Sequence, residues 1–182
     1  MIDKTALLDV ARRARMLALD FDGTLTDGSL HIHASGEVSK TVSYLDIVGV
    51  TRWRRLGHAL CIISGDGTSP IPAHFATAFK IPRLFVGRMD KLDALSEAAA
   101  EFGRTLDQTI YMGDDVMDLP AMQAAALGAT APTAHPHVLD HADWISTRPA
   151  GAGAVRELVD LVLSAQGHDV TELRPRGRLP SR

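Results

Sequence analysis

The chain has 182 residues, of which 46% are apolar and 23% charged, and this length suits one domain with a substantial core. Its formal net charge is −3, and the interspersed acidic and basic residues argue against a nucleic-acid partner. No apolar run is long enough to cross a membrane, residues 1–4 lack the order of a signal peptide, and a single cysteine cannot form an internal disulfide, so we expect a cytoplasmic protein without a membrane partner.

Apolar periodicity predicts helices and strands in alternation along the chain. The first half is expected to hold a helix over 5–15, a buried strand ending at Leu19, a β-hairpin within 27–43, a helix over 46–57 and a buried strand over 59–65. The second half is expected to hold helical structure within 66–80, strands at 83–86, 109–112, 127–130 and 144–145, and helices at 91–102, 119–126 and 153–165. We take residues 1–167 as a single domain, with the hairpin as a small flap, and residues 168–182 as a flexible tail that carries arginines.

Strands that alternate with helices predict an α/β fold, a Rossmann-like parallel sheet with helices on both faces and right-handed crossovers. Ligands bind such sheets beyond the carboxyl ends of the strands. The polar residues that follow the expected strands are Asp20 with Asp22, Ser64, and the sequence Gly113-Asp114-Asp115. We therefore expect these residues to meet in one site.

Asp20 and Asp22 are two residues apart at the end of a strand, so both carboxylates point to the same side. Carboxylates this close repel each other, and they must share a proton or hold a cation between them. The alternative is structural: Asp22-Gly23 could be an ordinary turn, and Gly113-Asp114-Asp115 a solvated turn after a strand. The rest of the chain supplies matching polar residues after other strands, and this favours the functional interpretation.

The sequence Asp20-Phe21-Asp22-Gly23-Thr24-Leu25-Thr26 resembles the first motif of the haloacid dehalogenase superfamily, most of whose members are phosphatases. The resemblance implies that Asp20 is a nucleophile that forms an aspartyl-phosphate, and that Asp22 is the general acid and then the general base. It also implies Mg²⁺ as cofactor, held by Asp20, the backbone carbonyl of Asp22, and Asp114. Mg²⁺ prefers such oxygen ligands, and it would offset the charge of a phosphate monoester.

Further positions match the superfamily by resemblance. Ser64 and Gly65 correspond to the residues that bind the transferring phosphate, and Lys91 corresponds to the phosphate-binding lysine. Asp118 would hold the acidic loop or a metal-bound water, and Asp115 is a further supporting residue. Without this context, a serine at the end of a strand is usually structural, and a lysine that begins a helix is usually solvated.

Residues 16–167 resemble a capless subgroup, the 3-deoxy-D-manno-octulosonate 8-phosphate (KDO 8-phosphate) phosphatases. The segment between Asp22 and Ser64 has room for a hairpin and a helix, but not for a large cap domain. The resemblance implies a homotetramer, in which the hairpins of several subunits meet and a neighbour's surface or tail closes the site. An unpaired hairpin would otherwise leave exposed edges.

The chain departs from this subgroup where the substrate is expected to enter. Ser64-Gly65-Asp66 stands where the relatives have Thr-Gly-Arg, and Leu45-Asp46-Ile47 stands where they have Arg-Asp-Gly, so that Asp46 remains as a supporting residue. Arginine is the usual bidentate partner of carboxylates and phosphates. We expect a Mg²⁺-dependent phosphatase of a small sugar phosphate or sugar-acid phosphate. The alternatives are a different phosphorylated sugar or nucleoside as substrate, or a non-catalytic oligomerising module.

Four histidines are candidate zinc ligands, namely His31 and His33 on the hairpin and His135 and His137 around a proline. We expect neither a cysteine partner nor a helical HxxxH pair to accompany them. Exposed or turn-stabilising roles are therefore favoured.

Overall fold

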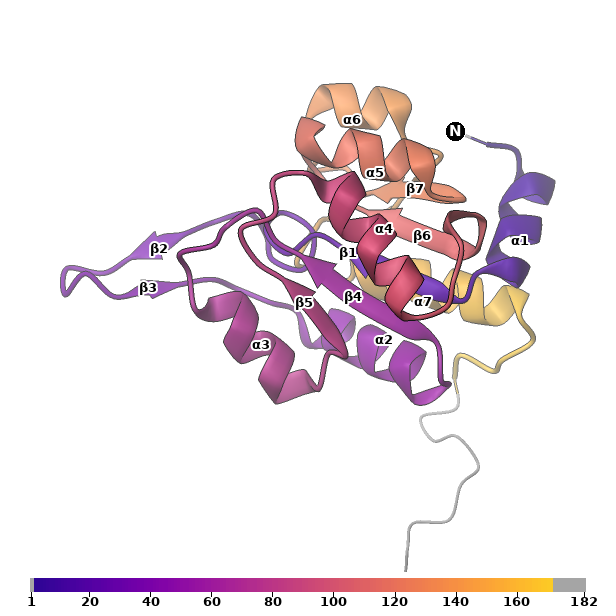
Figure 1. Ribbon diagram of the computed structural model, residues 1–182. Helices are drawn as coiled ribbons and strands as arrows, with labels where there is room; N and C mark the ends of the chain where they lie inside the picture. The colour runs from indigo at the N-terminus through magenta and orange to yellow at the C-terminus, as the bar shows by residue number, and fades with distance from the viewer. Residues whose placement is uncertain (1, 172–182) are drawn as a thin grey trace, which may run out of the picture.

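The computed structural model describes residues 2–171, so most of the predicted C-terminal tail lies outside the described residues. A six-stranded sheet forms the centre of the molecule, with all strands parallel and in the order β5-β4-β1-β6-β7-β8 (Figure 1). The strands are β1 (Met16–Leu19), β4 (Ala59–Ile63), β5 (Arg83–Phe85), β6 (Thr109–Met112), β7 (Leu127–Thr130) and β8 (Trp144–Ile145). The predicted parallel α/β sheet is confirmed. None of the helices in the described part of the chain is long and apolar enough to span a membrane.

Helices cover both faces of this sheet. Successive side chains of a strand point to opposite faces, and because both sets are apolar here, both faces must be covered. In β1, Leu17 and Leu19 face one core, and Met16 and Ala18 face the other. The first core is closed by α1 (Lys4–Arg13), α2 (Tyr44–Arg55), α3 (Ile71–Phe79) and α7 (Ala154–Ala165). The second is closed by α4 (Lys91–Glu101), α5 (Leu119–Ala124) and α6 (Pro136–His141).

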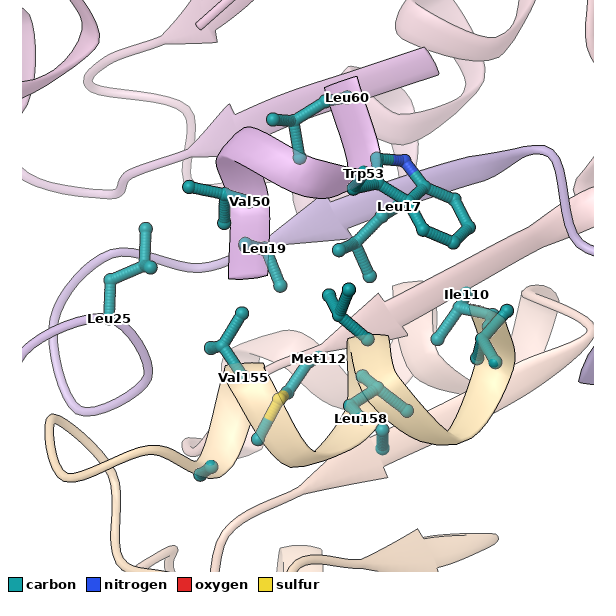
Figure 2. Close-up of a cluster of buried hydrophobic side chains, with 14 of the residues drawn as sticks. Leu17, Leu19, Leu25, Val50, Trp53, Leu60, Ile110, Met112, Val155 and Leu158 are labelled. Atoms are coloured by element: carbon teal, nitrogen blue, oxygen red, sulfur yellow. The ribbon is translucent and has the colours of Figure 1, made fainter. Parts of the chain in front are cut away.

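The first core fixes β1 in the middle of the sheet. Figure 2 shows Leu17 and Leu19 between side chains of α2 and α7, among them Trp53 and Val155. The Trp53 indole is fully buried, and its Nε1 donates a hydrogen bond to the carbonyl of Ala59 over 2.7 Å. Because β1 is packed on both faces and paired on both edges, the residues that follow it start from a rigid base.

The predicted hairpin is present and extends away from the sheet (Figure 1). Its short strands are β2 (His31–Ile32) and β3 (Val38–Ser39), which pair antiparallel. Apolar side chains on it are exposed, and Ile32 is 73% exposed. A bridge between Thr26 and Val42 joins the base of the hairpin to the loop that follows β1.

One helix was not predicted. No element was expected between the strands at 127–130 and 144–145, but α6 lies there, with Pro136 in its first turn. Proline suits this position because its missing N–H would have no partner inside the helix. His135 caps the helix, since its side chain accepts a hydrogen bond from the backbone N–H of His137 over 3.2 Å.

Candidate active site

The loops after β1, β4 and β6 surround a cavity of about 250 Å³ at the carboxyl edge of the sheet. Asp20 begins the first of these loops, and its N–H still pairs with the carbonyl of Met112 in β6 over 2.9 Å. The lining residues are Asp20, Asp22, Gly23, Gly28, Gly65, Asp66, Lys91, Asp114, Asp115, Met117 and Asp118. Most residues predicted for the site therefore meet around one cavity.

A tight turn holds the two first-loop acids in place. The buried Thr26 hydroxyl accepts hydrogen bonds from the N–H groups of Gly23, at 3.1 Å, and Gly28, at 3.2 Å. Gly23 has a φ of +74°, and a Cβ built there would lie 2.0 Å from Oδ2 of Asp114. Glycine is therefore required twice at this position, for the backbone conformation and for the approach of the acidic loop.

Three carboxylates face one ammonium group in the cavity. Asp20, Asp114 and Asp118 each offer an oxygen atom, and these atoms lie within 4.8 Å of one another. Lys91 Nζ contacts Oδ1 of Asp20, donates to the carbonyl of Ile63 over 2.9 Å, and lies 3.4 Å from Oδ1 of Asp118. One lysine cannot neutralise three acids, so the cluster is short of positive charge.

The pKa values of the site residues also reflect this shortage of positive charge. Burial raises the pKa of Asp20 to about 7, the charge of Asp118 adds to the rise, and Lys91 opposes it. Burial raises the pKa of Asp114 to about 8, and the neighbouring Asp20 adds to it. Burial alone would lower the pKa of Lys91, but the charges of Asp20 and Asp118 outweigh this, and the pKa rises. A divalent cation among these oxygens would let the acids ionise, so the donor set fits Mg²⁺.

Asp118 organises the acidic loop. Its Oδ2 accepts hydrogen bonds from the N–H groups of Asp114, at 3.0 Å, and Asp115, at 3.1 Å. Its Oδ1 accepts the hydroxyl of the buried Tyr111 over 2.7 Å. A Cβ on Gly113 would lie 2.3 Å from Cγ of Asp118, so this arrangement also needs glycine. Of the two roles expected for Asp118, the geometry favours holding the loop.

Not every predicted residue lines the cavity. Ser64 is buried, and its hydroxyl accepts the N–H of Asp66 over 3.2 Å. Asp46 is buried elsewhere: it accepts the N–H groups of Gly153, at 3.0 Å, and Arg156, at 2.8 Å, at the start of α7. Burial raises its pKa against the effect of these hydrogen bonds. Asp46 fastens α2 to α7 and does not reach the acids of the site.

Two side chains that bond to the acids of the site were not predicted. Tyr111 is one, and its only signal was a phenol in a mostly apolar strand. Lys40 is the other: it follows β3 in the hairpin, and its Nζ lies 2.8 Å from both carboxylate oxygens of Asp22. In the sequence, a lysine in an alternating hairpin strand is indistinguishable from a solvated one.

The histidines form no zinc site within residues 2–171. His31 and His33 are exposed, and His33 Nε2 lies 3.1 Å from the Ser39 hydroxyl. The expectation of no HxxxH pair was wrong, because His137 and His141 have this spacing on α6, with ring centroids 4.3 Å apart. No third ligand joins them among the described residues. His135 is exposed, one of the two roles expected, and its ring caps α6.

The family model of haloacid dehalogenase-like hydrolases matches residues 69–158. The 3-deoxy-D-manno-octulosonate 8-phosphate phosphatase of Salmonella typhi is 32% identical over 163 residues, which cover 90% of this chain and 86% of that protein. The chain belongs to the haloacid dehalogenase-like hydrolases. The recognition made from the motif at residues 20–26 is confirmed.

Solved structures of the family agree with this fold. The phosphatase of the same name from Moraxella catarrhalis, solved with a magnesium ion, a phosphate ion and KDO, aligns with a TM-score of 0.86 at 31% identity, covering 91% of this chain and 94% of that one. A cobalt-bound relative from Haemophilus influenzae aligns with a TM-score of 0.82 at 32% identity, covering 87% of this chain and 92% of that one. As in the sequence-based expectation, no large cap domain is inserted between β1 and β4.

A glycine substitution tests the approach of the two acidic loops in this hydrolase. Gly23→Ala should displace Asp114 and strain the turn, and we expect phosphatase turnover to fall by about 10²-fold or more, because small misplacements of reacting groups cost this much. Turnover of p-nitrophenyl phosphate and circular dichroism measure the effect. Gly36→Ala is the matched control: Gly36 has a φ of +84° but open space around it, so turnover should stay near wild type. Equal loss in both variants would contradict the prediction.

Proposed function

We propose that this chain is a Mg²⁺-dependent phosphatase that hydrolyses KDO 8-phosphate or a closely similar phosphorylated sugar acid through an aspartyl-phosphate. The observation that carries the proposal is the meeting of Asp20, Asp114, Asp118 and Lys91 at one sheet edge, in a chain about one third identical to phosphatases of that name. A domain freed from catalysis would have no physical need for this cluster. The non-catalytic alternative is therefore disfavoured.

Asp20, Asp114 and the backbone carbonyl of Asp22 would hold the magnesium ion. When bound, Mg²⁺ offsets the negative charge of these acids and of the phosphoryl oxygens. Lys91 supplies the remaining positive charge, and it is held in place by the carbonyl of Ile63. Gly65 is proposed to contact the phosphate from the cavity wall, and the buried Ser64 to support that contact by accepting the N–H of Asp66.

The reaction needs one nucleophile and one group that moves a proton. A carboxylate oxygen of Asp20 forms a bond to phosphorus, while the bond from phosphorus to the ester oxygen breaks. Asp22 gives its proton to that departing oxygen. Asp22 then takes a proton from a water molecule that attacks phosphorus, which releases inorganic phosphate and restores the Asp20 carboxylate. Their spacing on one loop lets the two acids work on opposite sides of the same phosphorus atom.

The charge at the mouth of the cavity bears on the substrate. Among the described residues that line the cavity there is no arginine, and Asp66 lies at its rim. However, Asp66 Oδ1 accepts three hydrogen bonds from Thr68 and Ser69, and its Oδ2 lies 3.6 Å from Lys40 Nζ. Asp66 therefore repels an anionic sugar less than its charge alone suggests.

A substrate panel tests this function. The kcat/KM values for KDO 8-phosphate, neutral sugar phosphates and nucleoside monophosphates should be highest for KDO 8-phosphate, and chelation of magnesium should abolish them. A higher kcat/KM for a neutral sugar phosphate or a nucleotide would show that the substrate is a different one, whereas the proposed reaction would stand. No turnover across the panel, together with a stable oligomer, would favour the non-catalytic alternative.

Assembly and location are part of the proposal. The exposed apolar residues Leu30, Ile32 and Val38 lie on the projecting hairpin. Contact with hairpins of other copies would bury them, and we propose a homotetramer that works in the cytoplasm with the hairpin as flap of a domain spanning residues 1–167. Sedimentation equilibrium measures the mass of the assembly, and a monomer would contradict it.

A further inference from the structure

Lys40 occupies an unusual position for a lysine. It lies on the returning arm of the hairpin, yet its side chain is only 7% exposed. The ammonium group sits 5.9 Å from the centroid of the Phe21 ring. This burial distinguishes Lys40 from an ordinary surface lysine, whose ammonium group stays in water.

Two carboxylates from two different loops meet this ammonium group. Lys40 Nζ lies 2.8 Å from Oδ1 and 2.8 Å from Oδ2 of Asp22, and 3.6 Å from Oδ2 of Asp66. Asp22 belongs to the loop after β1, and Asp66 to the loop after β4. The three donors of an ammonium group on a flexible stem suit such a bridge.

The partners of Lys40 differ in how firmly they are held. Asp66 is fixed, because its other oxygen accepts the N–H groups of Thr68, at 2.8 Å, and Ser69, at 3.1 Å, and these and the Thr68 hydroxyl lower its pKa to about 2. The Asp22 side chain is 37% exposed, and Lys40 is its hydrogen-bond partner. Asp66 thus anchors the lysine, and the lysine restrains Asp22.

We propose that Lys40 is a positioning residue that holds the Asp22 carboxyl group at the departing oxygen, with Asp66 as its anchor. The inference rests on the proposed phosphatase function, in which Asp22 moves the proton. Because Lys40 is part of the hairpin, the hairpin contributes directly to the acid step. The bridge at Thr26 and Val42 fixes the base of the same arm.

The dependence of the effect on the leaving group tests this role. An alkyl alcohol leaves phosphorus only when it receives a proton, whereas p-nitrophenolate leaves as a stable anion. For Lys40→Met, kcat/KM on the best alkyl phosphate of the panel should fall on the order of 10²-fold, the size of a general-acid contribution, and on p-nitrophenyl phosphate by less than about threefold. Lys40→Arg should recover most of the loss, because it restores a cation.

Two further variants complete the design. Asp66→Asn keeps an oxygen for the turn but removes the anchoring charge, so it should show the same pattern in weaker form. Lys4→Met, at an exposed position on α1, should leave both substrates unaffected. Equal loss on both substrates in Lys40→Met, or no loss on either, would overturn the positioning role while the phosphatase assignment stands. A wild-type protein that hydrolyses neither substrate would overturn the proposed function and this inference with it.

Discussion

Asp20→Asn is expected to lower phosphatase turnover on the order of 10⁴-fold or more, the scale of loss when a nucleophile is removed. An amide has no charged oxygen to attack phosphorus, and the site offers no second acid in the same place: Asp118 is occupied by Tyr111 and by two backbone N–H groups. Turnover of p-nitrophenyl phosphate in the presence of magnesium measures the effect.

The Asp20→Asn variant should fold, so that a loss of turnover can be attributed to the missing nucleophile. Lys91 retains Asp118 and the carbonyl of Ile63 as partners, and the substitution removes one of three mutually repelling carboxylates. Asp140→Asn is a suitable control, because Asp140 is an exposed acid on α6, and its loss should leave turnover unchanged. Wild-type turnover in Asp20→Asn, with the protein correctly folded, would show that another group is the nucleophile.

Magnesium should stabilise the protein more at pH 8 than at pH 6. The folded-state pKa values of about 7 for Asp20 and about 8 for Asp114 both lie above the usual 3.8. Raised carboxyl pKa values contribute stability that is fully present below pH 3.8 and is lost as the pH rises through 7 to 8. The metal-free protein therefore loses stability in this range, whereas Mg²⁺ binds the ionised acids. Each proton that Mg²⁺ displaces weakens its apparent affinity by about tenfold per pH unit below the pKa.

Thermal unfolding with and without magnesium measures this coupling. At a concentration 100 times Kd, binding contributes about 2.7 kcal/mol, which corresponds to a rise in Tm of roughly 5–10 °C for a chain of this size. Chelation should abolish turnover in parallel. Asp114→Asn removes a proposed ligand and a repelling charge, so it should unfold at a higher temperature than the wild type without metal at pH 8 and respond little to magnesium. A shift that is equal at both pH values, or unchanged in Asp114→Asn, would contradict the metal assignment.

The sheet and the acids at its edge could be predicted from the sequence for a clear reason. β1 and β4 are short apolar runs buried on both faces, and each is followed by polar residues and glycine, so the ends of these strands are marked in the chain itself. Since the carboxyl ends of parallel strands share one edge, Asp20 and Asp114 had to lie near each other. The carboxylate cluster follows from the parallel arrangement of the strands more than from any single motif.

Other parts depend on contacts that local sequence does not carry. Lys40 becomes a partner of Asp22 only because the hairpin returns across the loop after β1. Asp46 was expected to support the site but fastens α7, because its helix packs there. α6 was missed because it has only six residues, too few to show a helical period, and its signal is a proline that suits the first turn of a helix.

The two borders of the sheet have a consequence for how copies of the molecule meet. β5 at one border has three residues and β8 at the other has two, so an incoming chain would find few free N–H and C=O groups to pair with. The short edge strands thereby disfavour pairing between the sheets of two molecules, and this protects the protein from aggregation. Copies of the molecule would therefore associate through side chains, and the exposed apolar surface of the hairpin is the part of the described chain best suited to this contact.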